Sequence, residues 1–96
     1  MKYRKLPVEV EAVQYMPTGP RASVYFKDMP EWLDRAYDDD VVSNVGPSSI
    51  ESWLQIKTPE GIMRCAQGDW VIRGVEGELY PCKASVFAKT YEPVSC

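Results

Sequence analysis

Two cations and two aromatic side chains lie close together in the stretch AQGDWVIRGVEGELYPCK, at positions 66–83. A guanidinium pairs with phosphate in a bidentate manner, and an aromatic ring stacks on a nucleobase. Alternation along two neighbouring strands allows Arg73, Tyr80 and Lys83 to line one mouth. With Trp70, which turn chemistry does not explain, they predict a binding site for a small nucleotide-like anion. The alternative is that the cations are solvated on the sheet surface and the aromatic rings belong to the core.

The glycines and the aspartate of this stretch are explained by turn structure. Glycine adopts positive φ without steric cost, and an aspartate oxygen accepts backbone amides within a turn. We therefore expect four positions to be structural turn residues: Gly68, Asp69, Gly74 and Gly77.

The inventory of reactive side chains is small. Histidine is absent, and the three cysteines, Cys65, Cys82 and Cys96, have no C-x-x-C spacing. The commonest general base, the usual partner of a nucleophilic thiol and the commonest zinc ligand are therefore missing. Lys83 follows Cys82 and can lower a thiol pKa, but without a base we expect an unreactive thiol. The aspartates at 38–40 are not part of a glycine-punctuated calcium loop, so we predict no metal site. Together with the absence of histidine, this leads us to predict no catalytic residue and no cofactor.

The charge distribution argues against a nucleic-acid polymer as partner. The chain has 96 residues, a net charge of -3 and a pI near 4.9. Positions 28–60 hold eight carboxylates and two cations, and this acidic middle would repel a phosphate backbone. No apolar run approaches the length of a membrane span, and the basic N-terminus is not followed by the apolar stretch of a signal peptide. We expect a protein without a membrane partner, located in the cytoplasm.

Hydrophobic periodicity and turn residues predict a single α+β domain over residues 1–96. We expect a mostly antiparallel twisted sheet, or a partly closed barrel, of five or six strands with one packed helix and a short C-terminal helical turn. The expected elements, in chain order, are a strand at 7–15, a helix at about 29–37, a β-meander at 53–82, a helical turn at 84–89 and a last strand at 90–93.

Local signals mark the ends of these elements. Asp28 is expected to cap the helix, whose first turn contains Pro30, and the segment at 38–52 should be mainly loop. Reversals at 58–61, 67–69 and 74–77 should fold the following strands into the meander. Phe87 and Tyr91 are expected to plug one end of the sheet.

Both ends of the sequence resemble a group of small phage and prophage proteins. The opening KYRKLPVEVEAVQY is similar to a basic start with a KPVxVEA strand, and the closing GDWVIRGVEGELYPCKASVFAKTYEPV is similar to a PGDW or PGDY turn, a GExYPCK stretch and an F-x-x-T-Y end. Two departures, Gln67 for a proline and Ala84-Ser85 for a proline-aspartate pair, are expected to loosen the backbone. The matching positions are Lys5, Pro7, Val8, Glu11, Gln14, Gly68, Asp69, Trp70, Ile72, Gly74, Gly77, Glu78, Tyr80, Pro81, Lys83, Phe87, Thr90 and Tyr91.

The resemblance implies a phage-encoded accessory protein in the cytoplasm of an infected bacterial host. We expect a non-enzymatic binding protein that engages a host protein or sequesters a small nucleotide-like anion in an anti-defence role. Such a protein could form a homo-oligomer. One alternative is a small nucleotide-processing enzyme with Asp69 or Glu78 as base and Arg73 and Lys83 as electrostatic stabilisers. Another is a virion assembly protein that joins copies through exposed sheet edges. Both ligand-based hypotheses require Arg73, Tyr80 and Lys83 to share a concave surface.

Overall fold

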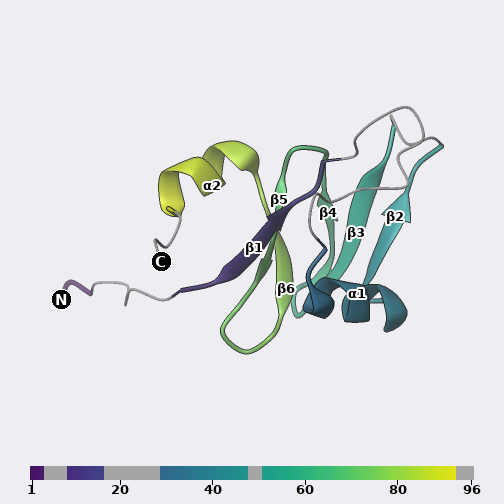
Figure 1. Cartoon of the computed structure of the whole chain (residues 1–96). Coiled ribbons are helices and arrows are strands. Elements are labelled where there is room, and N and C mark those ends of the chain that lie inside the picture. Colours follow the sequence, from purple (N-terminus) through teal and green to yellow (C-terminus); the bar gives the residue numbers. More distant parts are fainter. Residues whose placement is uncertain (4–8, 17–28, 48–50, 93–96) are drawn as a thin grey trace.

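The strands form two three-stranded antiparallel sheets (Figure 1). The computed structural model describes residues 1–3, 9–16, 29–47 and 51–92. The first sheet has the order β1-β5-β6, with β1 at Glu11–Gln14, β5 at Trp70–Arg73 and β6 at Leu79–Cys82. The second sheet has the order β2-β3-β4, with β2 at Val42–Val45, β3 at Trp53–Thr58 and β4 at Gly61–Cys65.

The mixed α and β character agrees with the sequence, but the expected single sheet of five or six strands, or partly closed barrel, is wrong. The meander breaks between β4 and β5, which belong to different sheets. The turn between them is fastened to the end of β1, because the Tyr15 amide donates to the Asp69 carbonyl at 2.8 Å and the Gly68 amide donates to the Tyr15 carbonyl at 2.7 Å. This attachment directs β5 to pair with β1 instead of with β4.

A strand occupies part of the segment that was expected to be mainly loop. β2 pairs antiparallel with β3, so that Val42 lies opposite Ile56 and Val45 lies opposite Trp53. Only Val42 is buried in this four-residue strand, so its sequence lacks the alternation of apolar and polar residues that predicts a strand. The rest of the expected loop includes residues 48–50, which lie outside the described part of the chain.

The first helix packs its apolar stripe into the core. α1 runs over Glu31–Asp38 and buries Leu33 and Ala36, and Pro30 occupies the position before its first residue. The expected cap, Asp28, and the beginning of the expected first strand lie outside the described residues.

The core lies between the two sheets and α1. β6 approaches both β3 and β4, which joins the sheets at this edge. Each strand except β1 contributes at least one fully or almost fully buried side chain, and Val13 of β1 packs against them. The buried members of this core are Tyr15, Leu33, Ala36, Val42, Leu54, Ile56, Cys65, Val71 and Leu79.

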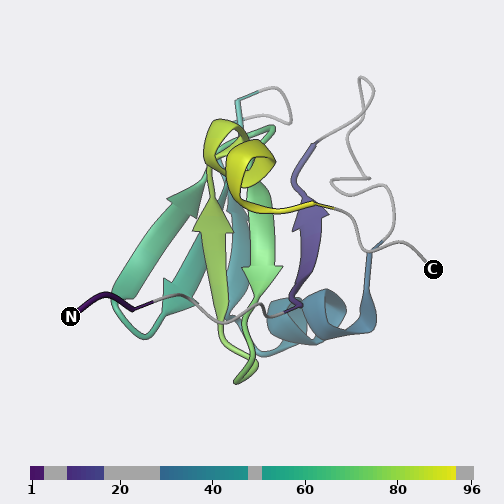
Figure 2. The ribbon, with the colours of Figure 1, turned by 90° about the vertical axis from the view of Figure 1, so that its left-hand side faces the viewer.

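The second helix replaces the expected last strand. α2 runs over Ala84–Thr90, and the Tyr91 amide still donates to the Phe87 carbonyl at 2.9 Å. Thr90 therefore ends a helix and does not begin a strand at 90–93, and residue 93 lies outside the described part. α2 lies against the first sheet, near β5 and β6 (Figures 1 and 2). No helix in the described ranges combines the length and apolar character that a bilayer crossing needs.

Candidate functional site

The register of the β5–β6 hairpin separates two of the four expected site residues. Arg73 lies opposite Leu79, and Tyr80 lies opposite Ile72. Directly opposed residues share a face and successive residues alternate, so Arg73 and Tyr80 project from opposite faces of the sheet. The expected mouth shared by Arg73, Tyr80 and Lys83 does not form, so the ligand-based hypotheses are wrong in the form that placed the ligand among these three residues.

One residue of loop length explains this difference. A reversal over 74–77 would place Glu78 opposite Arg73, and Tyr80 would then share the face of Arg73. In the structure the Gly74 amide donates to the Glu78 carbonyl at 2.8 Å, so the paired ends of the hairpin are Arg73 and Leu79. A shift of one residue in register moves every side chain of a strand to the other face.

Trp70 and Tyr80 hold α2 on the outer face of the first sheet. The Trp70 ring stacks on Phe87 with centroids 4.0 Å apart, and Phe87 contacts Tyr91 with centroids 5.1 Å apart. Partial burial, together with a side-chain hydrogen bond to Tyr91, raises the pKa of Tyr80 to about 12. These two candidate residues are therefore engaged in packing and hydrogen bonding with the helix.

The turn that contains Gly68 and Asp69 anchors the beginning of α2. Gly68 adopts a φ of 91°, which favours glycine, and Asp69 Oδ1 accepts the Ala84 amide at 3.1 Å. Lys83, the residue before α2, is exposed, and its carbonyl accepts the Phe87 amide at 2.8 Å. The structure therefore gives Asp69 a structural bond and leaves Lys83 at the head of the helix.

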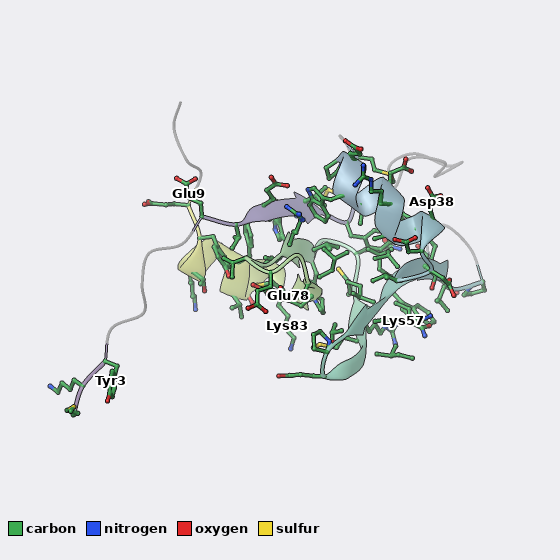
Figure 3. All side chains as sticks on the ribbon, turned by 90° about the horizontal axis from the view of Figure 1, so that it is seen from below. Tyr3, Glu9, Asp38, Lys57, Glu78 and Lys83 are labelled. Atoms are coloured by element: carbon green, nitrogen blue, oxygen red, sulfur yellow. The ribbon has the colours of Figure 1, made fainter. Side chains whose placement is uncertain are left out.

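Arg73 lines a pocket of about 410 Å³ on the other side of its strand. The pocket lies at the end of the molecule where α1 and the β5–β6 connection meet, and Figure 3 views the molecule from this end. Its polar and aromatic lining comes from α1 and the residue after it, the end of β3, and the β5–β6 hairpin: Trp32, Arg35, Asp39, Lys57, Arg73 and Glu78.

The three cations of this pocket differ in their partners. Arg35 pairs with Glu31 at 2.7 Å, and Lys57 pairs with Asp40 at 3.4 Å. In the part of the chain that the structure describes, the side chain of Arg73 has neither a hydrogen bond nor an ion pair. Its guanidinium is therefore available to a ligand without the loss of a protein contact.

The two carboxylates of the pocket also differ. One oxygen of Glu78 accepts the Glu76 amide at 3.1 Å, and the carboxylate fills the space that a Cβ at Gly74 would need. Gly74 does not adopt positive φ, and a Cβ at this position would displace the flexible Glu78 carboxylate. Asp39, which follows α1, is exposed and has no side-chain bond among the described residues. Asp39 is therefore available to a hydrogen-bond donor.

Sequence reasoning found Arg73, and Glu78 as a candidate base of the alternative enzyme, and missed the other polar and aromatic lining residues. Arg35 and Lys57 are the two cations within the acidic segment 28–60, and their isolation among eight carboxylates is a signal that was available. Trp32 gave no such signal, because a tryptophan on an amphipathic helix is explained by the core.

The thiols do not add chemistry to the site. Burial, with smaller contributions from Asp69 and Cys82, raises the pKa of Cys65 to about 12, and burial followed by Asp69 raises the pKa of Cys82. Both thiols are therefore protonated at neutral pH, and Cys96 lies outside the described residues. Within the described ranges, no group of three cysteine, aspartate or glutamate residues is arranged to hold a metal ion.

The fold and the pocket together define a small two-sheet α+β domain with a charged cavity at one end. No protein-family model, curated protein sequence or solved structure matches the chain. The class of ligand must therefore be argued from the pocket.

Proposed function

We propose that this chain is a non-enzymatic binding protein that takes a small anionic ligand of nucleotide size in the Arg73 pocket. The observation that carries the proposal is the unpartnered Arg73 guanidinium in a pocket that also presents Arg35, Lys57 and Trp32. A guanidinium binds phosphate or carboxylate in a bidentate manner, and an indole ring offers an apolar surface to a base. A volume of about 410 Å³ falls within the usual range of small-molecule pockets.

Binding is favoured over catalysis by the structural roles of the candidate bases. Asp69 accepts the first amide of α2, and Glu78 accepts an amide of its own turn. Each of these bonds engages only one carboxylate oxygen, but Asp69 is not among the described residues that line the pocket, and histidine, the commonest general base, is absent from the chain. The second candidate function, a small nucleotide-processing enzyme, therefore has less support than ligand sequestration.

The biological setting of the proposal comes from the resemblance to phage and prophage proteins. A protein of this kind would act in the cytoplasm of the infected bacterial host, where sequestering an anionic ligand would serve an anti-defence role. Engagement of a host protein, self-association and a role in virion assembly are separate outcomes, since none of them requires a ligand in the pocket.

Isothermal titration calorimetry with nucleotides and cyclic dinucleotides, preceded by a thermal-shift screen at low salt, tests the proposal. Arg73→Gln should weaken binding of any positive ligand at least about tenfold, because a charge-assisted bidentate pair is lost. Lys83→Gln is the matched control, since Lys83 is an exposed cation outside the pocket lining, and should change affinity less than about twofold.

Two results would contradict the proposal. Equal losses in the Arg73 and Lys83 variants would indicate non-specific attraction to cations, and the absence of any binding would remove the ligand altogether. Chromatography of the recovered ligand separates the two functions, since a binding protein returns it unchanged and an enzyme converts it.

A further inference from the structure

The charges around the Arg73 pocket contain information about the ligand beyond its sign. Among the described residues, three cations and two carboxylates line the pocket, and two further carboxylates, Glu31 and Asp40, pair with two of those cations. The cavity is therefore not a basic funnel of the type that holds polyphosphates.

Only one of the lining cations is free for an anion in the described part of the chain. The Arg35–Glu31 and Lys57–Asp40 pairs are neutral as units, whereas the Arg73 side chain has no partner among the described residues. Both pairs are largely exposed, with side chains between 55 % and 81 % accessible, so either cation can turn toward a ligand at small cost. Its carboxylate partner nevertheless stays nearby and keeps the local charge low.

The Asp39 carboxylate would repel a second anionic group of a ligand bound in the same pocket. Its carboxylate has no side-chain hydrogen bond among the described residues and can accept one from a ligand. A second or third phosphoryl group would be repelled by Asp39 and Glu78, whereas an amino or hydroxyl group of the ligand would be bound.

Resting on the proposed function, we infer that the pocket selects a ligand with one anionic group and a hydrogen-bond-donating end, such as a nucleoside monophosphate, over the corresponding polyphosphates. Arg73 holds the anionic group, and Lys57 supplements it after release from Asp40. Asp39 accepts from the donor end. Each added phosphoryl group is expected to weaken binding about fivefold through repulsion by the lining carboxylates.

Calorimetry with the mono-, di- and triphosphates of adenosine and guanosine, without divalent cations, tests this order. The monophosphate should bind tightest, and Asp39→Asn should reduce the preference over the triphosphate at least about threefold. Asp34→Asn is the matched control, because Asp34 is exposed on α1 outside the pocket lining and its loss changes net charge equally.

The outcomes distinguish the two levels of the proposal. If the triphosphates bind as tightly as the monophosphates or more tightly, and Arg73→Gln still abolishes that binding, the selectivity is wrong and the proposed function stands. If Asp34→Asn and Asp39→Asn alter the preference equally, the order reflects net charge and not Asp39, which also overturns the inference. If no nucleotide binds the wild-type protein, the proposed function and the selectivity are both wrong.

Discussion

The free energy of unfolding is expected to fall at alkaline pH, and part of this fall should disappear when the Cys65 thiol is removed. Cys65 is completely buried at the end of β4, and its Sγ lies 3.8 Å from the carbonyl oxygens of both Ala66 and Trp70. Burial, with smaller contributions from Asp69 and Cys82, raises its pKa from 9.0 to about 12. An ionised thiolate at this position would lie in the core, so the folded state resists deprotonation.

The direction of the effect follows from the protons bound by each state. The unfolded chain releases the Cys65 proton near pH 9.0, and the folded chain releases it only near pH 12. Between these values the folded state binds more protons, so the free energy of unfolding falls by about 1.4 kcal/mol for each pH unit. The contribution is complete below pH 9 and is lost as the pH rises toward 12. At about pH 11 the loss reaches about 2.5 kcal/mol, a large share of a typical domain stability.

Urea unfolding followed by tryptophan fluorescence, under reducing conditions at several values from neutral to about pH 11, measures this loss. Cys65→Ala should lower stability below pH 9 through the cavity that it leaves, but its decline between about pH 9 and pH 12 should be shallower than that of the wild type by about 1.4 kcal/mol per pH unit. Cys82→Ala is the control, since that thiol is only half-buried and should flatten the decline less. Parallel curves for wild type and Cys65→Ala would show that Cys65 ionises as easily in the folded state as in the unfolded state.

Three further substitutions test the contacts that fix the fold. Gly46→Ala should cost about 3 kcal/mol in urea unfolding, because its φ is 134° and the new methyl would overlap the Glu51 carbonyl oxygen and the Ser52 backbone; a loss below about 1 kcal/mol would contradict this. Gln67→Ala should cost about 1–2 kcal/mol in the same assay, because the Gln67 side-chain amide donates hydrogen bonds to the Ser52 carbonyl at 3.1 Å and to the Ser52 hydroxyl at 3.3 Å. An unchanged urea midpoint would refute this prediction. Phe87→Ala should cost about 2 kcal/mol because the stack on Trp70 is lost, and it should accelerate amide hydrogen exchange in α2 more than in the strands. Equal acceleration in α2 and in the strands would refute the inference that this stack attaches the helix locally.

The parts of the fold that depend on neighbouring residues could be predicted from the sequence. The reversal at 58–61 joins β3 and β4, with Thr58 opposite Gly61. The Thr58 hydroxyl donates to the Gly61 carbonyl at 2.7 Å and accepts the Glu60 amide at 3.1 Å, and Gly61 has a φ of 118°. Every one of these contacts lies within four residues, so turn chemistry alone was sufficient to find them.

The division into two sheets depends on contacts between distant residues. β5 pairs with β1, from which it is separated by more than fifty residues, and the Gln14 side-chain amide donates to the Gly68 carbonyl at 2.9 Å. Sequence patterns identify a strand but not its partner, so a chain of consecutive turns suggested a continuous meander. The Gln67 side chain also donates a hydrogen bond to the Ser52 carbonyl, so Gln67 ties the turn to the segment before β3.

The position of the candidate site follows from the register of one hairpin. With a four-residue reversal, Tyr80 would lie on the face of Arg73, and the two side chains would share one site there. The Gly74–Glu78 pairing shifts the register by one residue and puts Tyr80 on the opposite face, whereas Arg73 lines the pocket with residues of α1 and β3. The same Glu78 side chain fills the space beside Gly74, so the residues that set the register also supply one wall of the pocket. A substitution at Gly74 would therefore displace the Glu78 carboxylate, which would change both the hairpin and the distribution of charge in the pocket. The turn chemistry of the sequence is in this way linked to the selectivity proposed for the ligand.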